Sequence, residues 1–207
     1  MPAIFSYRLC FDKGNCFMSC SESSPNPNAS ILDRLLKVRT ILIGGPIEEE
    51  LAERVIAQAV LLNSESQDPI RIILTTPGGM VDVGFAIHDV FKFITAPLTI
   101  IGAGYVASMG IPILLSVPHD RRFSLPNTRY MMHQPSGGAG GQAKDIRITA
   151  QQIIKTRERL NLLISRETGQ PLEKVSADSD RDFWMSAEEA LEYGLVSKIV
   201  KNEKELA

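Results

Sequence analysis

Short apolar runs alternate with longer segments of helical periodicity along most of the chain. Four of the runs predict strands, over residues 40–43, 71–75, 98–101 and 129–132. The helix between the first two runs carries its apolar residues on one face: Leu51, Val55 and Ala59, with Ile56 and Val60 alongside. Strands separated by helices pair in parallel, so the pattern predicts an α/β fold.

Two more helices are expected after glycine-containing turns. The turn Pro77-Gly78-Gly79 follows the second strand and leads into a helix that reaches about residue 92. A second helix is predicted over residues 108–117, following the third strand. Residues 94–118 contain no charge, which by length alone meets the requirement for a membrane span. Prolines and glycines interrupt this segment, and its periodicity changes from strand-like to helix-like, so we interpret it as a buried strand, a turn and a helix.

The longest helix is predicted over residues 143–168, ending at Gly169. At 1.5 Å per residue it would span about 39 Å, more than a domain of this size needs. We therefore expect it to project and pack against another subunit. Near the end of the chain, Ser186 and Glu189 form a capping box for a helix that Gly194 closes, and residues 195–200 predict the last strand.

Composition and charge narrow the class of protein. The chain has 207 residues, of which 44% are hydrophobic and 22% charged, as in ordinary globular proteins. The formal net charge of −2 comes with no basic stripe, so nucleic acids are not expected partners. We expect one folded domain over residues 31–201, a flexible N-terminal segment over residues 1–30 and a tail over residues 202–207. The first seventeen residues are equally consistent with a misassigned start codon.

The three cysteines, Cys10, Cys16 and Cys20, lie together near the N-terminus. They are odd in number and provide no disulfide framework for the core, which favours a reducing cytoplasm. Three thiols without a matching histidine or a fourth cysteine make a poor zinc site, so no metal is expected. No secretory signal is evident, because charged residues interrupt the apolar positions at the start.

Ser108 is a candidate nucleophile. It lies in Gly104-Tyr-Val-Ala-Ser-Met-Gly110, where a buried strand gives way to a helix, so the amide of Met109 could face an oxyanion. The alternative is a serine that only caps the helix. An α/β-hydrolase elbow is disfavoured, because Val106 stands where that motif requires glycine.

His133 is the candidate general base, because it ends an apolar strand, where sites often form. A buried structural histidine is the alternative. The paired glycines after the second strand let Gly79 donate a second oxyanion hydrogen bond, although such pairs also form plain tight turns. Four carboxylates follow His133 and could orient it, and neither spacing nor periodicity chooses among them: Asp145, Asp178, Asp180 and Asp182.

Three motifs resemble the ClpP family of proteases. They are Tyr-Val-Ala-Ser-Met-Gly around Ser108, Met-Met-His-Gln-Pro-Ser-Gly-Gly around His133, and the eleven residues from Asp180, Asp-Arg-Asp-Phe-Trp-Met-Ser-Ala-Glu-Glu-Ala. They occur in the family's order, and the similarity extends over about residues 32–199. The resemblance implies an α/β, crotonase-like fold of repeated β-β-α units with a projecting handle helix, which falls on residues 143–168.

The resemblance also implies a function. By resemblance, the chain is expected to be a serine endopeptidase subunit that degrades unfolded polypeptides inside two stacked seven-membered rings. The subunit itself is expected to need no cofactor. An ATP-driven AAA+ unfoldase of the ClpX, ClpA or ClpC type would feed the rings, which are homomeric or mixed with a paralogue. By position, the family's nucleophile, base and acid fall on Ser108, His133 and Asp182, and its oxyanion amides on Gly79 and Met109.

Some residues depart from the family pattern. Thr75-Thr76 replaces Asn-Ser, His88 replaces a tyrosine, Pro112 enters the helix after Ser108, and the N-terminal axial-loop sequence is not recognisable. Two other functions remain open. One is a catalytically silent ring subunit, against which the intact Ser108, His133 and Asp182 argue. The other is an acyl-CoA hydratase or isomerase on the same fold, which would have no use for a paired serine and histidine.

Overall fold

The computed structural model describes residues 7–12, 15–20, 27–138 and 140–206, with side chains from residue 31 onward. The chain divides into two compact units, Met1–Leu35 and Leu36–Ala207. In the first unit, β1 (Tyr7–Asp12) and β2 (Asn15–Cys20) form an antiparallel pair. Helix α1 (Pro27–Lys37) begins in the first unit and ends in the second. The sequence had predicted neither of these two strands.

The second unit is built on a seven-stranded sheet with the order β3-β4-β5-β6-β9, in which β7 pairs with β5 and with β8. All of its strand pairs are parallel except β7 with β8. The strands are β3 (Thr40–Gly44), β4 (Ile70–Thr76), β5 (Leu98–Ala107), β6 (Arg122–Ser124), β7 (Arg129–Met132), β8 (Phe183–Met185) and β9 (Lys198–Ile199).

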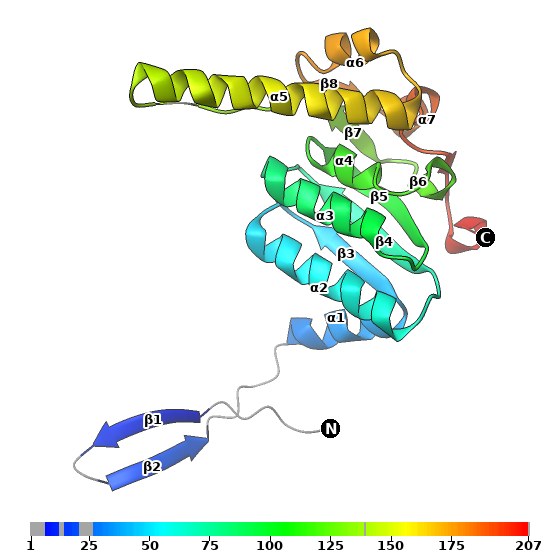
Figure 1. Ribbon diagram of the computed structural model, residues 1–207. Helices are drawn as coiled ribbons and strands as arrows, with labels where there is room; N and C mark the ends of the chain where they lie inside the picture. Colours follow the sequence, from blue (N-terminus) through cyan, green and yellow to red (C-terminus); the bar gives the residue numbers. More distant parts are fainter. Residues whose placement is uncertain (1–6, 13–14, 21–26, 139, 207) are drawn as a thin grey trace. The chain divides into compact units, whose positions relative to one another are not determined.

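Helices α2 (Glu49–Glu65), α3 (Val81–Phe93) and α4 (Gly110–Leu114) lie over one face of β3, β4 and β5 (Figure 1). Side chains alternate along β4, so that Ile70, Ile72 and Leu74 are fully buried at this face. The core therefore fills the space between these helices and the central strands. The remaining elements are α5 (Ala143–Thr168), α6 (Leu172–Asp178), α7 (Ala187–Tyr193) and the 3-10 helices η1 (His119–Arg121) and η2 (Glu203–Leu206).

Helix α5 runs well beyond the sheet at its N-terminal end (Figure 1). Its bounds confirm the predicted helix, and Gly169 ends it in a left-handed conformation. The buried residues Leu160, Leu163 and Ile164 fix only its C-terminal part to the unit. None of the helices in the described part of the chain is long and apolar enough to cross a membrane.

Several predictions of individual elements were wrong in extent. β5 continues through Gly102 and Gly104, where the sequence predicted a turn, because Gly104 takes a φ of 66° beside a register shift in β4. α4 is shorter than predicted: Ser108 has a non-helical backbone, and the Ser116 hydroxyl donates to the Ile113 carbonyl at 2.6 Å near the helix end. Pro112 lies in the first turn of α4, where it is tolerated.

Two further predictions differ from the structure. Val60 is 48% exposed, whereas Leu62 takes its place on the buried face of α2. β9 covers only Lys198–Ile199, because Leu195 still bonds back to the Ala190 carbonyl and β6 offers only a short edge. The capping box of α7 is present as predicted, with Ser186 and Glu189 bonding each other's backbone amides.

Candidate active site

Ser108 lies between β5 and α4, and its backbone adopts a left-handed conformation with a φ of 53°. This conformation is uncommon for a residue other than glycine. Two backbone hydrogen bonds hold it: the Ser108 amide donates to the Met131 carbonyl at 2.8 Å, and the Ile111 amide donates to the Ser108 carbonyl at 3.0 Å. Ser108 is not a helix cap, since Met109 occupies the N-cap position of α4.

The pairing of β7 with β8 places His133 and Asp182 opposite each other. The antiparallel register pairs Met132 with Phe183, so the residue after β7 faces the residue before β8. His133 Nδ1 lies 3.0 Å from Asp182 Oδ1, and His133 Nε2 lies 2.8 Å from Ser108 Oγ. The three side chains form one continuous line of hydrogen bonds with the imidazole in the middle.

Among the described residues, Asp182 is the one carboxylate of the four candidates that bonds His133. Asp178 instead accepts from the Tyr193 hydroxyl at 2.9 Å and pairs with Lys174. Asp180 lies 3.7 Å from Arg157, and Asp145 lies in the first turn of α5. The side chain of Asp182 is 64% exposed and that of His133 is 27% exposed, so solvent reaches the outer end of this line.

The turn Pro77-Gly78-Gly79 packs directly on Ser108. A Cβ at Gly78 would lie 2.5 Å from Ser108 Cβ and 2.9 Å from the Met109 nitrogen, so only glycine allows this approach. The buried Thr76 holds the turn, because its hydroxyl accepts from the Gly78 amide at 3.0 Å and donates to the Gly45 carbonyl at 2.7 Å. These two hydrogen bonds give Thr76, one of the two threonines that depart from the family pattern, a structural role.

The amides of Gly79 and Met109 are available beside the serine. The neighbouring amides are bonded, with Ile47 donating to the Gly78 carbonyl and Met80 donating to the Ile47 carbonyl, both at 2.9 Å. Within the described ranges, neither the Gly79 nor the Met109 amide has a backbone acceptor. Both are thus free to bind an anionic oxygen at the Ser108 hydroxyl.

A pocket opens next to Ser108 and His133, and it leaves about 390 Å³ of empty space, part of it open to solvent. Helix α5 forms one wall. The lining is largely apolar: Val81, Met109, Ile111, Pro112, Met132, Pro135, Leu160 and Ile164, with the polar Asn161 among them.

Residues that the sequence did not single out support the site. The Gln134 side chain donates to the Asp180 carbonyl at 2.7 Å, and the Ser179 hydroxyl donates to Asn161 Oδ1 at 3.1 Å. These bonds hold the turn before Asp182 against the end of β7 and against α5. The sequence feature that could have indicated a role for Gln134 is its position directly after His133. No sequence feature indicates a role for Ser179 or Asn161, since both are ordinary polar residues in helical or turn segments.

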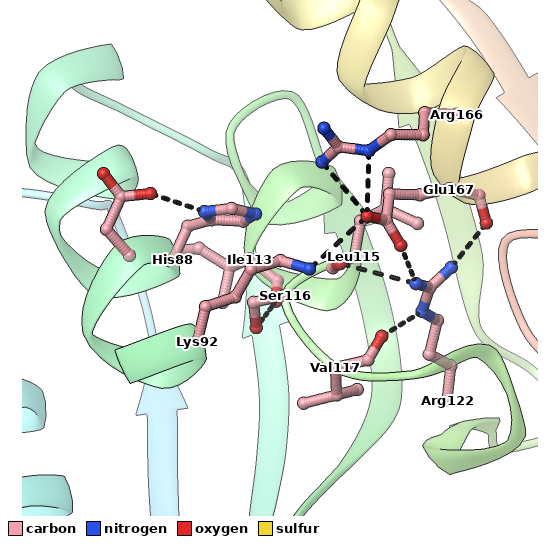
Figure 2. A network of polar contacts seen from close by, with 10 residues as sticks. His88, Lys92, Ile113, Leu115, Ser116, Val117, Arg122, Arg166 and Glu167 are labelled. Atoms are coloured by element: carbon pink, nitrogen blue, oxygen red, sulfur yellow. Dashed lines mark hydrogen bonds and ion pairs between the residues drawn. The ribbon is translucent and has the colours of Figure 1, made fainter. Parts of the chain in front are cut away.

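A buried ion pair fixes the C-terminal end of α5 (Figure 2). The guanidinium of Arg122, which is 1% exposed, lies 2.5 Å from Glu167 Oε2 and also donates to the carbonyls of Val117 at 2.7 Å and Glu167 at 2.8 Å. Lys92 from α3 lies 3.4 Å from Glu167 Oε1. Burial would raise the pKa of Glu167, but the hydrogen bond from Arg122 and the charge of Lys92 outweigh it and lower that pKa.

The other two histidines lie outside the site. His88 is buried on α3 (Figure 2). Its Nδ1 lies 2.8 Å from Asp89 Oδ1. Burial lowers the pKa of His88 from 6.5, although Asp89 acts in the opposite direction. His119 lies in η1. No group of three or more histidine, cysteine, aspartate or glutamate side chains in the described ranges is arranged to hold a metal ion.

Comparisons with known proteins identify the family of this chain. A family model described as Clp protease matches residues 23–203. The chain belongs to the Clp protease family. Subunit 3 of the proteolytic component of the ATP-dependent Clp protease from Rhizobium etli is 52% identical over 172 residues, which are 83% of this chain and 89% of the relative. Subunit 2 of the Pseudomonas aeruginosa protease is 44% identical over 178 residues, 86% of this chain and 89% of the relative.

A solved Clp protease structure shares the fold. A mutant of ClpP1 from Listeria monocytogenes matches with a TM-score of 0.80 and 48% sequence identity, covering 86% of this chain and 99% of that chain. The match confirms the ClpP-like α/β fold inferred from the motifs. As a member of the Clp protease family, the chain is a serine-type endopeptidase subunit.

Proposed function

We propose that this chain cuts peptide bonds with Ser108 as nucleophile, His133 as general base and Asp182 as the group that orients the imidazole. One observation carries the proposal: the line of hydrogen bonds from Ser108 Oγ through His133 to Asp182, at 2.8 Å and 3.0 Å. A serine hydroxyl is a weak nucleophile until a base takes its proton, and this arrangement provides the base at hydrogen-bond distance.

In the first half of the reaction, His133 Nε2 takes the proton of Ser108 as the Oγ atom bonds to the substrate carbonyl carbon. The carbonyl electron pair moves onto oxygen, where the amides of Gly79 and Met109 stabilise the negative charge. Asp182 accepts from His133 Nδ1 and so holds the tautomer in which Nε2 is the base. His133 then gives its proton to the amine nitrogen, the C–N bond breaks, and an ester on Ser108 remains.

In the second half, His133 takes a proton from water, and the resulting hydroxide attacks the ester carbonyl. The same two amides stabilise the second oxyanion. As the C–O bond to the serine breaks, Ser108 Oγ recovers the proton from His133. The side chains and amides of this chain supply every group in these steps, so the proposal needs no cofactor in the subunit.

The subunit would act within an assembly of stacked heptameric rings, either homomeric or mixed with a paralogue. The projecting part of α5 supports self-assembly, because Ile146, Ile148 and Ile154 are 42%, 54% and 56% exposed on it. The relatives are named ATP-dependent, which supports an AAA+ unfoldase of the ClpX, ClpA or ClpC type as the partner that delivers unfolded polypeptides. The lack of a disulfide framework favours the cytoplasm as the location.

A fluorescent fluorophosphonate tests the assignment, because it labels an activated serine. Wild type should be labelled, Ser108→Ala should not, and Ser64→Ala, which removes an exposed serine hydroxyl, should label like wild type. Particle size is measured on the same samples. An unlabelled wild type in a fully assembled particle would instead favour a silent ring subunit.

A further inference from the structure

Thr76 is the last residue of β4, and its side chain is fully buried beside the turn that carries Gly79. A buried hydroxyl needs hydrogen-bond partners, because leaving a buried polar group unpaired is costly. Both partners of Thr76 lie in turns: its Oγ1 donates to the Gly45 carbonyl at 2.7 Å and accepts from the Gly78 amide at 3.0 Å. The hydroxyl therefore joins the turn after β3 to the turn after β4.

The peptide planes on either side of Gly78 are each held by one hydrogen bond. Gly78 has a φ of 91°, and a glycine backbone has little conformational preference of its own. The Thr76 hydroxyl holds the plane before Gly78, and the Ile47 amide holds the plane after it by donating to the Gly78 carbonyl at 2.9 Å. Because the C=O and N–H of a trans peptide point in opposite directions, the Gly79 amide is directed away from Ile47.

The methyl group of Thr76 contacts the segment that carries the second amide. A Cβ added at Gly110 would lie 2.5 Å from Thr76 Cγ2, so the methyl group packs closely on this glycine. Gly110 begins α4 and directly follows Met109, whose amide is the other proposed oxyanion donor. One side chain thus touches both segments that carry the two amides. Its hydrogen bonds go to backbone atoms of the turns, so it acts through these segments.

We infer that Thr76 is a positioning residue that aligns the amides of Gly79 and Met109 on the substrate carbonyl oxygen as that oxygen becomes negatively charged. Oxyanion donors stabilise the transition state when they point at the place where the charge develops. A misaligned donor therefore slows the chemical step and leaves substrate binding nearly unchanged. The inference rests on the proposed role of the two amides and adds the group that holds them in place.

The test compares Thr76→Val, which keeps the shape of the side chain without the hydroxyl, with Thr76→Ser, which keeps the hydroxyl. A fluorogenic peptide amide is the substrate. Removing an oxyanion donor lowers kcat about 10²- to 10³-fold, so misaligning one in Thr76→Val should lower it about 30-fold, with KM within about twofold of wild type. Thr76→Ser should keep kcat within about threefold of wild type, because the hydrogen bonds can still form.

Thr128→Val is the matched control. Thr128 is also buried, and its hydroxyl donates to a strand carbonyl, that of Gly102, at 2.9 Å. The control therefore loses a buried hydroxyl of the same kind that bonds neither turn, and its kcat should equal that of wild type. Particle size and the urea midpoint are measured for every variant, so that a loss of assembly or of folding stability is separated from a loss of turnover.

A peptide boronate gives a readout that a purely structural role would not move. It forms a tetrahedral adduct with a serine oxygen, so its affinity depends on the oxyanion donors, whereas the same peptide with hydrogen in place of boron forms no adduct. In Thr76→Val the boronate should lose about 30-fold in affinity and the unreactive peptide under about twofold. Thr76→Cys, with a weakly bonding thiol, should fall between the valine and serine variants, and it takes the place of Thr76→Val if that protein does not assemble.

Two results would overturn the inference. One is a Thr76→Val or Thr76→Cys protein that turns over as fast as Thr128→Val in a particle of the same size. The other is an equal loss of affinity for the boronate and for the unreactive peptide. Failure of the proposed catalytic role would give a different pattern: Ser108→Ala would cleave the peptide like wild type, and wild type would bind the boronate no better than the unreactive peptide.

Discussion

Removing the carboxylate of Glu167 should destabilise the protein more than removing any other charged side chain of α5. The side chain of Glu167 is 16% exposed and its partner Arg122 is 1% exposed. Glu167→Ala leaves the guanidinium buried against three carbonyls, of Val117, Leu115 and residue 167 itself, without a counterion. Breaking a buried pair by removing one partner costs about 3 to 5 kcal/mol.

The lower end of that range applies here, about 3 kcal/mol, because the three carbonyls remain and Glu167 is not fully buried. Glu167→Gln keeps an acceptor for Arg122 and should cost about 1.5 kcal/mol. Glu158→Ala, at an exposed position of the same helix, should cost under about 0.5 kcal/mol. The comparison therefore separates the loss of the ion pair from a general effect of changing α5.

Urea unfolding followed by the fluorescence of Trp184, the single tryptophan, measures these differences. All proteins are compared at one concentration, since assembly adds to apparent stability. With a slope of about 2 kcal/mol per molar urea, Glu167→Ala should lower the midpoint by about 1.5 M. Because the folded-state pKa of Glu167 is lowered from 4.5, its contribution is present above that pH and is lost as the pH falls through the folded value. A midpoint for Glu167→Ala equal to that of Glu158→Ala would refute the argument.

Three further outcomes are expected. Asp182→Asn should lower kcat about 10⁴-fold with little change in the urea midpoint, because the carboxylate is exposed and acts on the His133 tautomer; a loss under tenfold would contradict this. Gly78→Ala should cost about 1 to 3 kcal/mol and abolish labelling of Ser108, whereas Gly138→Ala, whose added Cβ meets no atom within 4 Å, should be neutral in both assays. Because the folded pKa of His88 is lowered from 6.5, wild type should lose stability as the pH falls below that value, and His88→Phe should lose less; equal slopes in both proteins would exclude a contribution from His88.

The elements that the sequence predicted well carry their own local signals. Helix α5 has a regular apolar period and a glycine at its end, and α7 has a capping box, so their bounds follow from short-range chemistry. β7 is a short apolar run between turn residues. Among the elements that were missed, β6 and β8 lack such signals, because each has three residues, too few to show a period.

The choice of carboxylate illustrates what local patterns cannot decide. Asp182 reaches His133 because β8 pairs antiparallel with β7 and aligns Phe183 with Met132. That register depends on contacts between segments about fifty residues apart, which periodicity does not encode. The motif beginning at Asp180 supplied the assignment by resemblance. Likewise, nothing local to Asn161 or Ser179 indicates that the fold brings them together beside the pocket.

Because the backbone of Ser108 is strained, folding stability and catalytic activity favour different residues at this position. A glycine there would relieve a conformation that costs a side-chain-bearing residue about 1 to 2 kcal/mol, and it would remove the hydroxyl at the same time. Directed evolution that selects for heat resistance alone would therefore favour stable variants without catalytic activity. Any search for a hardier variant should score turnover in every round.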